Sequence, residues 1–576
     1  MGSIFARAIR ATIIAVIVIA TPLATLGQEW LARPVYRSPL AVAFSPDGRT
    51  LAVTDPTAGA VVLIDPSTGN ITHEMSLPDE PSGLAWAADG RSCYVAQRSA
   101  GSVAEIDLSG KIVQHLDVAR RPMGVALAPQ RGLLLTANGA TDTASIVDLA
   151  EGRETTRVKV ARMPYFLAVT PDETMAVVGN RIPAGPSTDS RTTAVVSLID
   201  LKSSPPKRLT DIRLPPNSVN VHGVAISPDG HWAYLAHNVG RAALPTEQIE
   251  YGWISANALS LVDLRQRKLY ATILLDQPNE GAANPWGVAV SPDGATLWVT
   301  LSGIHRLGRL DLGGLHDFLR PRQPLIEKAR RDMVQDGSEM QIDPTTLGYS
   351  DVSKTTAAGR NRIEVVVTDL PLQYGQGLYL NDVFVQSDLP GNGPRGLCIS
   401  PDGRTLAVAV YFTGTVLLVD TSTSEVQATV TLPNQPPPDE ARRGERIFHD
   451  ATFCFEHWLS CVTCHPDGRA DGLNWDLLND GIGNPKNTRS LLLAHRTPPA
   501  MSRGVRPDME SAVQAGFQFI LFNKSTPENH EAVAAYLRSM QPAISPYRIE
   551  DRLSPKAERG RALFERSRQG CSVCHT

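Results

Sequence analysis

Residues 42–55 read VAFSPDGRTLAVTD, and the chain repeats this pattern along most of its length. Close copies are VAISPDGHWAYLAH from Val224, VAVSPDGATLWVTL from Val288 and LCISPDGRTLAVAV from Leu397, and weaker copies begin at Leu84, Val125 and Leu167. In the close copies an apolar segment enters a Pro-Asp-Gly turn and an alternating segment leaves it. That pattern is typical of two antiparallel strands joined by a tight reversal.

The spacing of the copies indicates how many strands each unit holds. With Ser45 as the marker, the equivalent residues follow at steps of 42, 41, 42, 57, 64 and 109 residues. Segments such as VLIDP and ITHEMSLP supply a third and a fourth strand, which is the signature of β-propeller blades. Seven copies predict an all-β, seven-bladed propeller over residues 28–432, in which RPVYRSP near Arg33 supplies a closing strand for the last blade.

The repeats resemble the YVTN-type propellers of exported bacterial proteins. The resemblance covers most of the first 430 residues and implies the fold. It implies little about function, because a propeller is a platform that serves many activities.

The longer steps place insertions at residues 182–191 and 239–256, between a second and a third strand, and at residues 314–386, after a third strand. Loops between second and third strands emerge on the propeller face that also carries the connections between blades. The residues just before the inner strands line the channel mouth on this face: Leu40, Ser82, Met123, Tyr165, His222, Trp286 and Arg395. These residues are either ordinary rim packing or, beside the enlarged loops, a docking face.

Length and charge limit the possible classes of protein. At 576 residues the chain is too long for one compact core, which predicts two or more domains. The formal net charge of −4 gives no electrostatic basis for binding nucleic acid.

The N-terminal residues predict export. Arg7 and Arg10 precede an apolar run that ends in small residues around Gly27, so residues 1–27 read as a secretory signal peptide. An uncleaved anchor is the alternative, but the run is short for a membrane span, and no other segment could cross a bilayer. We therefore expect a periplasmic protein without a stable membrane span after cleavage.

A Pro-rich linker, residues 433–440, ends the propeller, and helical patterns follow it. The sequence CVTCHPDG then places Cys461, Cys464 and His465 in the Cys-x-x-Cys-His motif that attaches haem c. Two thiols three residues apart reach the two vinyl groups along one haem edge, and the adjacent histidine becomes the proximal iron ligand. A zinc site would need a second Cys or His pair at ligand spacing, and none accompanies the motif.

The residues around this motif resemble a complete α-helical cytochrome c-type haem domain over residues 441–541. In that family the first helix carries a glycine and, four residues later, an aromatic residue; here these are Gly444 and Phe448. The last helix packs on them with a Tyr-Leu pair, here Tyr536 and Leu537.

Candidates for the sixth iron ligand lie 36 and 44 residues after His465. They are Met501, which we prefer because two prolines hold it, and Met509. His495 and an open sixth position are the alternatives.

A second haem unit begins near the end of the sequence. AERGRALF from Ala557 repeats ARRGERIF from Ala441, and Cys571, Cys574 and His575 form a second Cys-x-x-Cys-His motif. Residues 555–576 therefore predict a second haem c site in a cytochrome c-type domain that lacks a distal loop and a closing helix. Either another chain covers this haem or the gene product is incomplete, and we expect incompleteness.

Two consecutive haem motifs, with CVTCHPDGRADG, GNPKNTRSLLLA and RTPPAMSRG, resemble the di-haem bacterial cytochrome c peroxidase and MauG superfamily over residues 441–576. The resemblance implies electron transfer or oxidoreductase activity with a redox partner protein or an oxidant such as peroxide, and a calcium ion near Asn487 and Thr488. The family's tryptophan between the haems is missing from MSRGVR (residues 501–506), so enzymatic activity stays open. The alternative is a propeller-based ligand-binding or redox-sensing module whose haems do not turn over a substrate.

Overall fold

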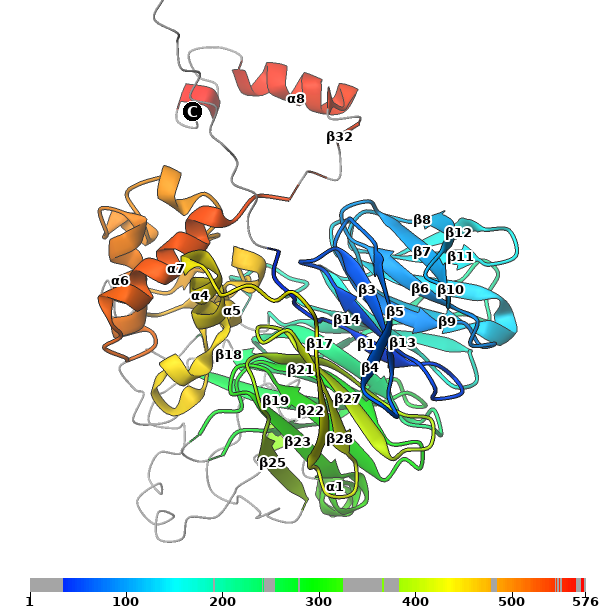
Figure 1. Ribbon diagram of the computed structural model, residues 1–576. Coiled ribbons are helices and arrows are strands. Elements are labelled where there is room, and N and C mark those ends of the chain that lie inside the picture. Colours follow the sequence, from blue (N-terminus) through cyan, green and yellow to red (C-terminus); the bar gives the residue numbers. More distant parts are fainter. Residues whose placement is uncertain are drawn as a thin grey trace, which may run out of the picture. The chain divides into compact units, whose positions relative to one another are not determined.

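The computed structural model describes residues 35–189, 192–240, 242, 254–277, 280–324, 365–366, 383–477, 484–543, 545, 548–549, 552–565 and 571–573. Within these residues, seven antiparallel sheets form the blades of a propeller, which confirms the predicted fold (Figure 1). The predicted signal peptide, residues 1–27, lies outside the described residues.

Each of the first four blades contains four strands paired in chain order. Blade one holds β1 (Val42–Phe44), β2 (Leu51–Asp55), β3 (Ala60–Asp65) and β4 (Asn70–Ser76), and blade two holds β5 (Pro81–Trp86), β6 (Ser92–Gln97), β7 (Ser102–Asp107) and β8 (Ile112–Asp117). Blade three holds β9 (Pro122–Ala128), β10 (Leu133–Asn138), β11 (Thr143–Asp148) and β12 (Arg153–Lys159), and blade four holds β13 (Pro164–Val169), β14 (Met175–Asn180), β15 (Val195–Asp200) and β16 (Lys207–Arg213).

The remaining blades carry the larger insertions. Blade five holds β17 (Ser218–Ile226), β18 (Trp232–Gly240), β19 (Ser255–Asp263), β20 (Lys268–Leu274) and an added outer strand, β24 (Val365–Val366). Blade six holds β21 (Pro285–Val290), β22 (Thr296–Leu301), β23 (Arg306–Asp311) and β25 (Phe384–Asp388), and blade seven holds β26 (Pro394–Ile399), β27 (Thr405–Val410), β28 (Thr415–Asp420) and β29 (Val426–Thr431).

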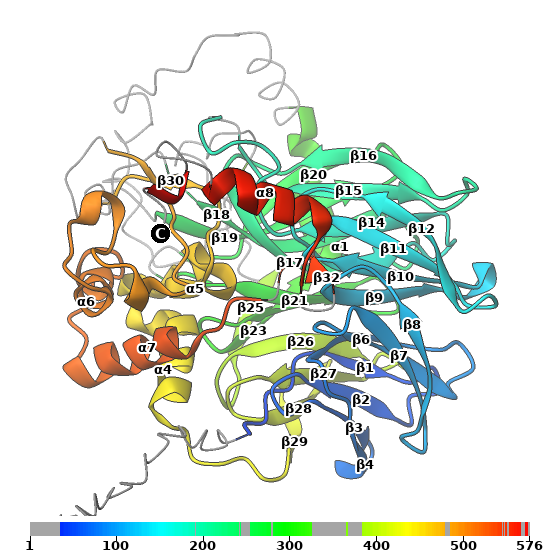
Figure 2. The ribbon, with the colours of Figure 1, turned by 90° about the horizontal axis from the view of Figure 1, so that it is seen from above.

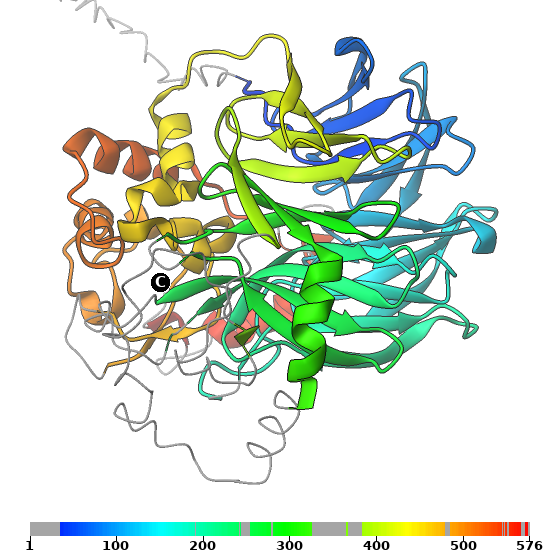
Figure 3. The same cartoon turned by 90° about the horizontal axis from the view of Figure 1, so that it is seen from below.

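The insertions lie at the predicted places, two of them between a second and a third strand and one after a third strand. The third insertion begins with α1 (Leu312–Leu319), the green helix in Figure 3. Leu312, Leu315 and Leu319 are buried in the same hydrophobic core as residues of β22 and β23. The helix therefore completes the core of blade six.

A side-chain network explains why the Pro-Asp-Gly turns form. In blade one the Ser45 hydroxyl donates to Asp47 Oδ1 (2.6 Å) and accepts from the Thr50 amide (3.0 Å). Gly48 lies at φ 71°, a left-handed conformation that glycine adopts without strain. Equivalent bonds recur at Ser227, Ser291 and Ser400.

The propeller ring closes between blade seven and blade one without exchange of a strand. The first strands contact one another in cyclic order, from β1 through β5, β9, β13, β17, β21 and β26 back to β1. The Gly396 amide donates to the Leu40 carbonyl (3.0 Å) across this junction. Blade seven holds four strands of its own, so the predicted closing strand near Arg33 is wrong for the described residues of that segment.

The N-terminal segment instead binds the linker. The Arg37 amide donates to Gln435 Oε1 (2.6 Å), and the Asp439 amide donates to the Tyr36 hydroxyl (2.8 Å). Both ends of the linker are therefore attached to the segment that precedes blade one.

A helical region, residues 440–540, lies beside the propeller (Figure 2). It contains α4 (Glu440–His449), the single turn α5 (Cys461–Cys464), α6 (Met509–Phe519), α7 (Pro527–Ser539) and a short hairpin of β30 (Asn474–Trp475) and β31 (Lys486–Asn487). The chain continues through β32 (Arg548–Ile549) and β33 (Arg552–Leu553) to α8 (Pro555–Glu565). None of the helices in the described part of the chain is both long and apolar enough to span a membrane.

The first and last helices of this region cross closely, as the sequence predicts. A Cβ atom added to Gly444 would lie 1.7 Å from the Ala532 carbonyl oxygen, so only glycine permits the crossing. Phe448 meets Tyr536 edge-on with ring centroids 5.4 Å apart, and Leu537 is buried. The contact between α4 and α7 forms the back of the helical core.

Candidate functional site

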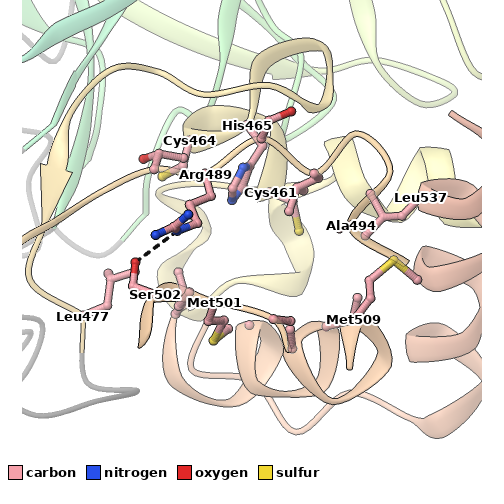
Figure 4. A pocket seen from close by; sticks show the side chains of 18 of the residues that line it. Cys461, Cys464, His465, Leu477, Arg489, Ala494, Met501, Ser502, Met509 and Leu537 are labelled. Atoms are coloured by element: carbon pink, nitrogen blue, oxygen red, sulfur yellow. Dashed lines mark hydrogen bonds between the residues drawn. The ribbon is translucent and has the colours of Figure 1, made fainter. Parts of the chain in front are cut away.

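A largely apolar pocket lies in the helical region, between α5 and the two helices α6 and α7 (Figure 4). Its volume is about 680 Å³, and cofactor sites commonly enclose about 300–1,000 Å³. Hydrophobic side chains form most of its wall, among them Leu459, Val513, Phe517, Val533 and Leu537. The pocket therefore suits a large, mainly apolar group.

The α5 turn presents two thiols to this pocket. Cys461 and Cys464 stand three residues apart on one face of the turn, and both line the pocket. The turn is capped reciprocally by Ser460 and Thr463, since each side chain binds the other residue's backbone amide. Burial raises the pKa of Cys461 to about 12 and that of Cys464 well above its ordinary value. Both thiols are therefore neutral in this state.

His465 follows the turn and points into the pocket (Figure 4). Its Nδ1 lies 3.1 Å from the Arg469 carbonyl oxygen. A carbonyl only accepts, so Nδ1 carries the proton of the neutral ring in this contact, and the ring also interacts with the Arg489 backbone. Burial lowers the pKa of His465, which favours this neutral, metal-binding form.

Two of the predicted sixth ligands lie across the pocket. Met501 and Met509 both line it, and Figure 4 shows Met501 on the side opposite His465. His495 is not among the described lining residues. The assignment of the sixth ligand stays a prediction.

One edge of the pocket is basic. A neighbouring hollow of about 460 Å³ shares part of the pocket wall and is lined by Lys486, Asn487, Thr488, Arg489, Ser502 and Arg503. The positive side chains oppose a calcium ion beside Asn487 and Thr488 and suit carboxylates instead. Among the described residues, no group of three or more His, Cys, Asp or Glu side chains is arranged to hold a metal ion.

The predicted rim residues meet at the mouth of the propeller. Trp286 stacks on His222 with ring centroids 5.5 Å apart and meets Tyr165 edge-on at 5.9 Å. Leu40 and Met123 belong to the same buried cluster. The prediction that these side chains converge on one face is confirmed.

The helical region docks on this face. Asp467, two residues after His465, forms ion pairs with Arg181 (3.0 Å) and Arg121 (3.5 Å) of the propeller. Burial alone would raise the pKa of Asp467, but these guanidinium groups hold it well below its ordinary value. The helical region therefore contacts the propeller on the face that carries the rim residues.

Three propeller side chains that the sequence patterns did not single out reach the α5 turn: Asn220, Asn257 and Asn284. Asn220 and Asn284 each stand two residues before a predicted rim residue and adopt φ values of 57° and 55°. Asparagine occupies this left-handed region more readily than most residues. Asparagine at this repeat position, in NVH and NPW, is the signal that identifies Asn220 and Asn284, whereas Asn257 lies within β19 and no such signal marks it.

The second haem motif is described only in part. Cys571 is exposed, and Cys574 and His575 lie outside the described residues. The helix α8 buries none of its residues, and a Cβ atom added to Gly560 would meet nothing within 4 Å. The second site therefore stays a prediction.

The fold and the site together define a seven-bladed propeller joined to a helical region that presents a Cys-x-x-Cys-His turn to an apolar pocket. No protein-family model matches the chain. Among curated proteins it is similar to two hydrazine synthase subunits of Kuenenia stuttgartiensis. It is 23% identical to subunit beta over 227 residues, 39% of this chain and 47% of that protein. It is 32% identical to subunit gamma over 148 residues, 23% of this chain and 42% of that protein.

The chain thus spans less than half the length of each of these curated relatives. Among solved structures, hydrazine synthase of Kuenenia stuttgartiensis matches with a TM-score of 0.53 and 22% identity. That match covers 69% of this chain and 99% of the other chain. At this identity the structural likeness establishes the propeller fold alone.

Proposed function

We propose that this chain is a haem c protein in which the helical region carries out electron transfer and the propeller holds that region. The observation that carries the proposal is the arrangement of Cys461, Cys464 and His465 around one apolar pocket, with the histidine tautomer set by the Arg469 carbonyl. A redox function agrees with the similarity to two subunits of hydrazine synthase.

The described residues fit haem c. Two neutral thiols on one face of a helical turn would hold the edge of the group by thioether bonds, and His465 Nε2 would ligate the iron. The apolar wall formed by α6 and α7 would enclose the macrocycle. Lys486, Arg489 and Arg503 at the basic edge would bind the propionate carboxylates.

When bound, haem c supplies one-electron transfer between ferric and ferrous iron. The chain's own residues set the conditions for it. The Arg469 carbonyl holds the His465 ring in one orientation, and the side chains of Phe517, Val533 and Leu537 exclude water from the pocket. Low local polarity and a fixed ligand both reduce the reorganisation that accompanies a change of charge.

Peroxide reduction, which the resemblance to the cytochrome c peroxidase and MauG superfamily implies, is the enzymatic form of this proposal. It requires an open position opposite His465. Met501 and Met509 both line that side, so methionine ligation favours electron transfer over peroxidase chemistry. Optical and paramagnetic-resonance spectra with and without peroxide distinguish electron transfer from peroxide reduction. Low-spin iron whose spectra do not change when peroxide is added supports electron transfer without peroxidase activity.

The similarity to hydrazine synthase subunits supports a role for this chain in a multi-subunit assembly that acts on small nitrogen compounds. Export to the periplasm remains part of the proposal, because haem c is attached outside the cytoplasm and residues 1–27 have the pattern of a signal peptide. The redox-sensing alternative has less support, because the propeller face predicted to receive a ligand receives the helical region.

The test uses the full chain with Cys571→Ser and Cys574→Ser, expressed in a periplasm that attaches haem c. We expect haem to stay on the denatured protein after acid–acetone extraction. Adding Cys461→Ser and Cys464→Ser should release it. Loss of haem from the first protein would refute the proposal.

A further inference from the structure

Propeller side chains hold the backbone that carries the Cys461–His465 motif. Asn257 Nδ2 donates to the Trp458 carbonyl (3.1 Å), and Asn220 Nδ2 donates to the Thr463 carbonyl (2.8 Å). The two donors come from β19 and β17 of blade five, about 200 residues or more away in sequence. They bind the chain before and within the α5 turn.

Asn284 joins the cap of the same turn. Its Nδ2 donates to Ser460 Oγ (2.9 Å), and its Oδ1 accepts from Thr463 Oγ1 (2.8 Å). Thr463 Oγ1 also accepts from the Ser460 amide (3.0 Å). The two side chains that cap α5 therefore have a common partner, and that partner belongs to the propeller.

The three asparagines support one another. Asn238 Nδ2 donates to Asn257 Oδ1 (2.6 Å) and Asn238 Oδ1 accepts from Asn220 Nδ2 (3.1 Å), while the Asn284 amide donates to Asn257 Oδ1 (3.1 Å). Asp276 accepts from both the backbone amide and the side chain of Asn257 (2.7 and 2.8 Å). All five residues are at most 5% exposed, so each lost bond leaves a buried polar group without that partner.

The two backbones also touch directly. The Gly281 amide donates to the Glu456 carbonyl (2.6 Å), and a Cβ atom on Gly281 would lie 2.2 Å from Trp458 Cα. Propeller and motif therefore approach to a distance at which a shift of either one moves the other.

Other blades use buried asparagine differently. Asn180 lies at the end of β14 in blade four, a position similar to that of Asn238 near the end of β18. Its side chain donates to the Val195 carbonyl and to Ser197 Oγ, both in its own blade. Among the described residues, the side-chain hydrogen bonds to the α5 turn and to the Trp458 carbonyl come from blades five and six, beside one enlarged loop.

We propose that Asn220, Asn257 and Asn284, the asparagine cluster, are positioning residues that fix the geometry of the Cys461–His465 turn for its haem. The propeller is then a structural part of the haem site. The statement about haem rests on the proposed function, whereas the statement about the turn does not.

The test removes the side chains without adding backbone strain. Asn220→Gly and Asn284→Gly keep a residue that tolerates positive φ, so their effects report lost hydrogen bonds. Met163→Gly is the matched control, because Met163 occupies the same repeat position in blade four at φ 57°. All variants are made in the full chain with Cys571→Ser and Cys574→Ser.

The first measurement is amide hydrogen exchange of residues 458–466 in protein produced without haem. We expect roughly tenfold or more loss of protection in the asparagine variants and none in Met163→Gly. The second measurement is the midpoint potential and paramagnetic-resonance signature of the haem-loaded protein, which should shift in the same two variants only.

Unchanged protection of residues 458–466 in both folded asparagine variants would overturn the inference. If Asn284→Gly does not fold, the exchange measurement on Asn220→Gly, which removes one hydrogen-bond donor to the turn, decides the inference by itself. Absence of haem from every variant would refute the proposed function instead, and the exchange result would still decide whether the propeller holds the turn.

Discussion

Replacing Gly444 by alanine tests whether the close crossing of α4 and α7 forms the helical region. The new Cβ atom would lie 1.7 Å from the Ala532 oxygen, 2.3 Å from the Ala532 carbonyl carbon and 2.9 Å from the Val533 nitrogen. All three are backbone atoms, so no side chain can rotate away. The helices must separate by roughly 1.5 Å to restore ordinary contact, which would loosen the packing of Phe448 on Tyr536. We expect destabilisation of the helical region by about 3 kcal/mol, the upper end of ordinary overpacking.

The assay must report on the helical region alone, because a chain with more than one domain does not unfold in a single transition. Urea titration with hydrogen exchange of the α4 and α7 segments meets this need. Gly560→Ala is the matched control, since Gly560 holds the same place in the repeated sequence but meets nothing within 4 Å. It should stabilise α8 by about 0.5–1 kcal/mol. Equal urea midpoints for Gly444→Ala and the unmodified protein would refute the reasoning.

Three further predictions use other parts of the chain. Met501→Ala should abolish the near-infrared sulfur-to-iron band of the haem-loaded protein, whereas an unchanged band would leave Met509 or an open position. Trp286→Ala removes a buried ring and should destabilise the propeller rim by about 3–5 kcal/mol. It should also change the rate of haem reduction, measured by stopped flow, while the haem spectrum stays the same. Reduction kinetics identical to those of the unmodified protein would mean that Trp286 only packs the rim and does not affect electron transfer. His237 is fully buried, and burial lowers its pKa from 6.5 to about 4, so the unfolded chain binds the extra proton. Stability should therefore fall by roughly 2–3 kcal/mol as pH falls from 6.5 to 4, and His237→Gln should remove that part of the slope in urea titrations at several pH values.

The propeller was predictable because its information is local and repeated. Ser45, Asp47 and Gly48 make one turn with their own side chains and backbone, and each later copy makes it again. The closing strand was not predictable, because residues 35–39 have a strand-like composition whatever they pair with. Hydrogen bonds to Gln435 and Asp439, about 400 residues away, decide the outcome.

The same distinction applies to the candidate site. Cys461, Cys464 and His465 are recognisable because their spacing alone sets the chemistry. The rim was found as a ring of equivalent positions, but its occupant was left open, since nothing local states that Asp467 pairs with Arg181. The asparagine cluster was missed because asparagine at a left-handed position, as at Asn220 and Asn284, is typical of an ordinary turn, and Asn257 is one polar residue within the strand β19.

The interface between the two parts of the chain bears on how they fold. It contains buried asparagines, an ion pair of Arg181 with Asp467 and a buried Arg442 that donates to Ser38 Oγ (2.8 Å) and the Tyr411 carbonyl (3.2 Å). These buried polar and charged groups favour the contact between the propeller and the helical region only when every hydrogen-bond or ion-pair partner is present. A group left without its partner lowers the stability of the contact. The linker adds to this, because its bonds to Tyr36 and Arg37 limit how far the helical region can move. Blades and helices therefore depend on each other: the propeller supplies the partners of the motif, and the helical region covers polar groups that the rim would otherwise expose.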